Sequence, residues 1–192
     1  NIGGQHLKGQ STESKPATAG QQETTTAKET QTFAGSTISS GSGSVTAAAL
    51  GDLSVSGSTL AAEQNINLIG DSVSVNAQVN TTTSKEVQGN PYGGRHWQIT
   101  DKQTQTLAGG QVDAGQDINV IAGMSADLGY QVGLLASPTS ALPQRANNAP
   151  NANSGNITLS GAQLSAGTPG SQKAGQVNLL AQGDIDIGTV EV

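Results

Sequence analysis

Four neighbouring side chains form the densest group in this sequence that could contact a ligand. Tyr92, Arg95, His96 and Trp97 lie within six positions of a chain that has one Trp, two Tyr and one Phe. An exposed aromatic ring beside a guanidinium group can stack on a sugar or anchor a protein partner. Alternatively, Trp97 folds back over the body of the protein or caps a break in it. The group is therefore a candidate partner contact, with the structural alternative left open.

Metal ligands are sparse. His6 and His96 are the only histidines, and no third ligand accompanies them, so a zinc site is not expected. Asp52 and Asp71 lie at similar turns, where stacked carboxylates could hold Ca²⁺. Their separation of 19 residues differs from the 20–21 residues of the strand repeat described below, and turn aspartates usually bond their own backbone. We predict no metal and no cofactor.

Catalytic groups are equally scarce. Asp184 and Asp186 could form the carboxylate pair of a glycosidase, but no His, Arg or aromatic residue lies near them in sequence. The chain has no cysteine, which excludes thiol catalysis, disulfides and zinc–thiolate sites. It also has no Gly-x-Ser-x-Gly turn of the hydrolase type. We predict no catalytic residue, and a carbohydrate-active enzyme ranks last among the functions considered.

Charge and hydropathy exclude two further classes of partner. The net charge is -6, and the eight Lys and Arg residues are scattered along the chain. Nucleic-acid binding needs a clustered basic surface, so no nucleic-acid partner is expected. No apolar run approaches the roughly 18 residues of a membrane-spanning helix.

A short alternating sequence pattern recurs along the chain and predicts the strands that would position a site. Alternating polar and apolar residues recur at 44–47, 52–55, 65–68, 72–75, 117–120, 156–159, 176–179 and 184–187. Such alternation has the period of a β-strand with one buried face. Val45 and Ile66 are 21 residues apart, and Leu53 and Val73 are 20 residues apart. The spacing indicates structural repeats that stack on one another.

Each repeat contains a third, weaker apolar position, which lies at Ile38, Leu60, Val112 and Leu164. Glycine and aspartate precede many of the strands, as tight turns require. Three short strands per period of about 20 residues describe a solenoid, in which the apolar residues of successive coils form inward columns. We therefore predict an all-β fold, a right-handed parallel β-helix (β-solenoid) with about 20-residue coils and extra-helical loops.

The repeat divides the chain unevenly. Residues 1–34 are polar, show no apolar alternation, and are expected to be irregular or peripheral: an outer extension, an irregular coil or disorder. Residues 35–192 are expected to form the β-helix. Insertions at 78–106 and 136–153 interrupt it, and the second insertion is rich in Pro, Asn and Ala.

Several of these segments resemble haemagglutinin repeats of the filamentous-haemagglutinin-like exoproteins of two-partner secretion. The resemblance is carried by Ala34-Gly35-Ser36-Thr37-Ile38, Gly51-Asp52-Leu53-Ser54-Val55, Ala114-Gly115-Gln116-Asp117-Ile118 and Ser160-Gly161-Ala162-Gln163-Leu164. It covers residues 30–190, and the first residues, Asn1-Ile2-Gly3-Gly4, suggest a piece of a longer protein. The resemblance implies an outer-membrane transporter as partner, secretion, and display at the bacterial cell surface.

The resemblance also implies a role. The family includes adhesins, haemolysins and the effectors of contact-dependent growth inhibition. We expect a segment of the structural shaft that projects an adhesive or toxin region and assists toxin delivery in the growth-inhibition branch. The alternative is an adhesin segment whose loops bind a receptor on a host or neighbouring bacterial cell.

Overall fold

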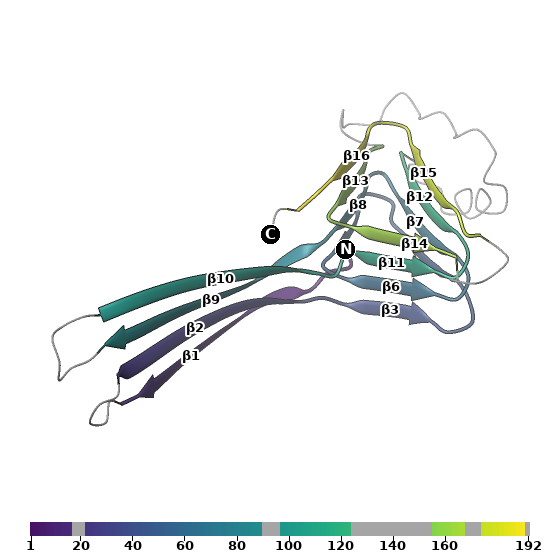
Figure 1. Cartoon of the computed structure of the whole chain (residues 1–192). Helices are drawn as coiled ribbons and strands as arrows, with labels where there is room; N and C mark the ends of the chain where they lie inside the picture. Colours follow the sequence, from purple (N-terminus) through teal and green to yellow (C-terminus); the bar gives the residue numbers. More distant parts are fainter. Residues whose placement is uncertain (17–21, 90–96, 124–154, 168–173, 191–192) are drawn as a thin grey trace. The chain divides into compact units, whose positions relative to one another are not determined.

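The computed structural model describes residues 1–16, 22–89, 97–123, 155–167 and 174–190 (Figure 1). Within these ranges every regular element is a strand, and three of the four sheets are parallel. The prediction of an all-β fold with parallel sheets is therefore confirmed, and the arrangement is compatible with a β-solenoid. These residues contain no helix long and apolar enough to cross a membrane. The predicted insertion at 136–153 lies outside them.

Successive groups of three strands, which we call rungs, contribute one strand to each parallel sheet. The first two rungs are β3 (Thr37–Ser40), β4 (Val45–Ala48), β5 (Leu53–Ser56) and β6 (Thr59–Ala62), β7 (Ile66–Gly70), β8 (Val73–Asn76). The last two are β11 (Gln111–Ala114), β12 (Ile118–Ala122), β13 (Ile157–Ser160) and β14 (Gln163–Ala166), β15 (Val177–Ala181), β16 (Ile185–Gly188). The sheet orders are β14-β11-β6-β3, β15-β12-β7-β4 and β16-β13-β8-β5, and Figure 1 shows the strands stacked in this order.

The register confirms the columns that the repeat predicted. Val45, Ile66, Ile118 and Val177 pair in succession, and so do Leu53, Val73, Ile157 and Ile185. The members in the first three rungs are buried and form the core. The exception is the last rung, where Val177 is 43% and Ile185 45% exposed. These two residues belong to the columns but lie on edge strands, which no further described strand covers.

Side-chain amides add a second, polar column on the sheet that contains β4. The Asn67 amide donates to the Thr46 hydroxyl over 3.1 Å, Asn119 donates to Asn67 over 2.9 Å, and Asn178 donates to Asn119 over 2.9 Å. Asn67 is only 7% exposed. A buried amide is costly unless it is hydrogen-bonded. This ladder supplies hydrogen bonds to asparagine side chains that the sequence pattern had assigned to solvent.

The fourth sheet is antiparallel, with the order β1-β2-β9-β10. It consists of β1 (Gln5–Lys15), β2 (Glu23–Ala34), β9 (Gln78–Gly89) and β10 (Trp97–Ala108). This sheet and the three parallel sheets form two separate compact units. Residues 1–34 thus contain two strands where the sequence pattern identified none. Their residues are polar on both faces, so they lack the apolar alternation that marks a half-buried strand.

Candidate interaction surface

The antiparallel sheet has two long exposed strands at its edges. β1 is exposed along its whole length, and β10 is exposed up to its last residue. Residues paired across strands share a face. His6 and Phe33 pair in register, and their rings meet edge to face with centroids 5.0 Å apart. We call the side that carries this pair the aromatic face.

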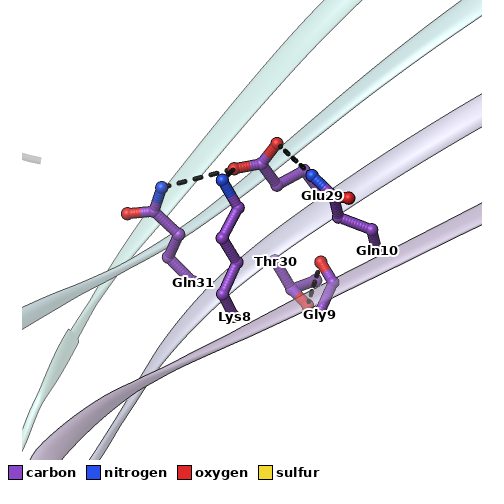
Figure 2. Close-up of polar contacts among 6 residues, drawn as sticks. All are labelled: Lys8, Gly9, Gln10, Glu29, Thr30 and Gln31. Atoms are coloured by element: carbon purple, nitrogen blue, oxygen red, sulfur yellow. Dashed lines mark hydrogen bonds and ion pairs between the residues drawn. The ribbon is translucent and has the colours of Figure 1, made fainter.

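Figure 2 shows the Glu29 carboxylate with three donors. Gln10 pairs with Glu29 four residues along from the pair of His6 with Phe33, so the carboxylate lies on the same face. The Lys8 Nζ atom is 2.7 Å from Oε1 of Glu29. Gln10 donates to Oε2 of Glu29 over 3.2 Å, and Gln31 donates to Oε1 over 3.4 Å. The hydrogen bond from Lys8 is the largest cause that lowers the pKa of Glu29 below its usual value of 4.5, followed by those from Gln10 and Gln31. Three donors from β1 and β2 thus share the Glu29 carboxylate, so the cluster links the two strands.

The lowered pKa of Glu29 leads to a prediction about how the stability of the sheet depends on pH. Replacing Lys8 by glutamine removes the main stabiliser of the carboxylate, so the pKa of Glu29 should rise toward its usual value. Because the folded-state pKa is depressed, the cluster stabilises the sheet above the unfolded-state pKa, and this contribution is lost as pH falls through the folded-state pKa. Carbon-13 NMR titration of the Glu29 side chain measures the shift. Lys15→Gln is the control and should leave that titration unchanged.

Of the predicted contact group, the structure describes Trp97 alone; Tyr92, Arg95 and His96 lie outside the described residues. Trp97 begins β10 and lies against Gly89, the last residue of β9. A Cβ atom on Gly89 would lie 2.0 Å from Cε3 of the indole. The ring therefore rests on the glycine backbone and buries it, while 51% of the tryptophan remains exposed.

The turn residues Asp52 and Asp71 do not stack on one another. Leu53 pairs with Val73, which places Asp52 level with Ser72. Asp71 instead lies level with Gly51, to whose carbonyl its backbone N–H donates over 2.8 Å. Over the described ranges, no group of three or more His, Asp or Glu side chains could hold a metal ion. The offset noted in the sequence therefore persists in the structure.

Asp184 and Asp186 lie at the exposed strand β16. The backbone N–H of Asp184 donates to the Asn156 side chain over 2.9 Å, and Asp186 pairs with Thr158 in the neighbouring strand. Both aspartates are exposed, and no basic or aromatic residue lies beside them in these pairings. The two aspartates therefore occupy exposed positions at the edge of a parallel sheet.

Comparisons with known proteins supply no identity. The chain matches no family model, and searches of curated proteins and of solved structures find no significant match.

Proposed function

We propose that this chain is a segment of the structural shaft of a large secreted, surface-displayed bacterial exoprotein, folded as a right-handed parallel β-helix. The observation that carries the proposal is the open end of the three parallel sheets. β14, β15 and β16 are the outermost strands, and the column residues Val177, Ile185 and Ile187 are 43%, 45% and 69% exposed. A further rung in the same register would cover these residues and continue all three sheets.

The stacked core of the parallel sheets also supports a shaft. Stability in stacked repeats comes from contacts between neighbours, so the same apolar and amide columns can be extended indefinitely. The four aligned rungs have a narrow core of Val, Ile, Leu and Ala, which suits a long rod. The resemblance to haemagglutinin repeats adds the proposed context: export by an outer-membrane transporter, and projection of an adhesive or toxin region from the cell. We propose a non-enzymatic role.

A second candidate function is receptor binding by the antiparallel sheet itself. The observation that favours it is Trp97, whose indole is half exposed beside the polar strand β9. Solvent-exposed tryptophan is frequent at binding hot spots. In this alternative the shaft carries its own adhesive surface, and the partner is a host or bacterial receptor.

Display at the cell surface is testable with a single thiol, since this chain contains no cysteine. Ser39→Cys, on an exposed position of β3, should react with a membrane-impermeant maleimide on intact producing bacteria. Val75→Cys, at a fully buried position, is the control and should react only after denaturation. Deleting the cognate outer-membrane transporter should abolish surface labelling. If Ser39→Cys reacts only after cell lysis, the surface proposal is wrong.

A further inference from the structure

The two hairpins of the antiparallel sheet, β1–β2 and β9–β10, are inserted at equivalent points of the parallel-strand repeat. Ile2 and Val75 both pair with Val55, on its two sides, and β1 and β9 each begin three residues after them. β2 ends three residues before the parallel strand β3, and β10 ends three residues before the parallel strand β11. β3 and β11 pair with the two sides of β6 in the same register. β1 and β9 are therefore equivalent first strands, and β2 and β10 are equivalent second strands.

The sheet already contains one junction between hairpins, where the second strand β2 pairs with the first strand β9. A simple rule governs this junction: every charged residue faces an uncharged one. The pairs are Glu23 with Gly89, Lys28 with Ser84, Glu29 with Thr83, Lys85 with Ala27 and Glu86 with Thr26. Like charges opposite each other destabilise a sheet, and this register avoids them.

Among the described strands, β10 lies at one edge of the sheet with no first strand beyond it, and β1 lies at the other edge. Gln5 corresponds to Gln78 and Ala34 to Ala108, so the equivalent residues differ by 73 in first strands and by 74 in second strands. These offsets convert the existing pair of Thr30 in β2 with Thr82 in β9 into a new pair, in which Thr104 of β10 lies opposite Gly9 of β1.

We infer that the free edge of β10 binds β1 of a second copy of this chain, antiparallel and in this register. The charge rule holds at all five charged positions of the new junction. The pairs are Lys8 with Gln105, Glu13 with Thr100, Lys15 with Gln98, Asp101 with Thr12 and Lys102 with Ser11. Leu107, 45% exposed, would lie opposite His6 of the second copy and extend the aromatic face.

This association is head to tail, because each copy offers a different edge to its neighbour. Such contacts are heterologous, and they build open chains of molecules unless the rotation between copies closes a ring. Long edge strands with unpaired backbone groups are the usual template for this pairing. The new junction follows from the pairings of the antiparallel sheet and from the equivalent insertion points of its two hairpins. It does not depend on the proposed shaft function.

Single-cysteine variants identify the strands that meet. Ser11→Cys and Lys102→Cys place one thiol each on exposed positions of β1 and β10. After the two variants are mixed and oxidised, the mixed disulfide dimer should dominate over either homodimer. Homodimers in excess would show that like edges pair, and this would overturn the inference.

A charge pair tests the register. Thr12 faces Ala27 within its own sheet, so neither a positive nor a negative charge there meets a like charge directly opposite. In the new junction it faces Asp101 of the second copy. By sedimentation velocity at low salt, Thr12→Lys should tighten self-association and Thr12→Asp should weaken it, each by up to about fivefold, with the difference fading as salt is added. A chain that stays monomeric at every concentration, or equal shifts by both variants, would overturn the inference.

Discussion

Replacing Ile157 by alanine should lower the free energy of unfolding by about 2–5 kcal/mol, the usual cost of removing most of a buried isoleucine. Ile157 is fully buried in the column between Val73 and Ile185. The lost contacts lie on both sides, because a rung is packed between two neighbours. Urea denaturation with linear extrapolation measures the change, provided that unfolding is two-state.

Ile185→Ala is the matched control, since Ile185 is the same residue type in the same column, one rung further along. It is 45% exposed, so its truncation should cost about 1 kcal/mol at most, close to the range of surface substitutions. Equal losses at the two positions would contradict the column as described. In a longer molecule with a further rung, the proposed shaft requires the cost at Ile185 to rise toward that at Ile157.

Gly109→Ala should destabilise the junction before β11 severely. Gly109 has a φ of +64°, and a Cβ atom there would lie 2.0 Å from the carbonyl carbon of Gly57. The left-handed conformation alone costs an alanine about 1–2 kcal/mol. The overlap with rigid backbone adds to this, because no rotamer change can relieve it. We expect a loss above about 2 kcal/mol, seen as a lower urea midpoint.

Gly51→Ala is the control for glycine replacement itself. Gly51 also lies in a turn, but a Cβ atom there would meet nothing within 4 Å. The expected change is within about 0.5 kcal/mol. If both variants lose the same stability, the close approach of Gly109 to Gly57 is not what requires glycine at that position.

The parallel strands could be predicted because their signal is local and repeated. Val45 and Ile66, or Leu53 and Val73, each occupy the apolar position of an alternating segment, and a constant spacing aligns them. Stacking equivalent segments leaves few other registers, since a shift by one residue would turn every apolar side chain outward. Both the strands and their pairing therefore followed from composition and spacing.

The antiparallel sheet gave no such signal. Its strands carry Thr, Gln, Lys and Glu on both faces, and the central junction joins β2 to β9, whose paired residues Gln31 and Thr81 are 50 positions apart. The grouping around Glu29 depends on the pairing of β1 with β2, and the contact between Trp97 and Gly89 depends on the pairing of β9 with β10. Neither pairing could be derived from a polar pattern, because polar strands of this kind have no preferred buried side.

The sequence by itself determined the strand repeat, the apolar columns and the absence of thiol chemistry, because each depends on residue type and spacing alone. Only the tertiary structure decided which column members are covered, how Asn67, Asn119 and Asn178 pair, and where the polar strands join. The physical reason is that burial and hydrogen bonding belong to pairs of neighbours. Ile157 and Ile185 have the same side chain and the same local pattern, yet only Ile157 has a rung on each side.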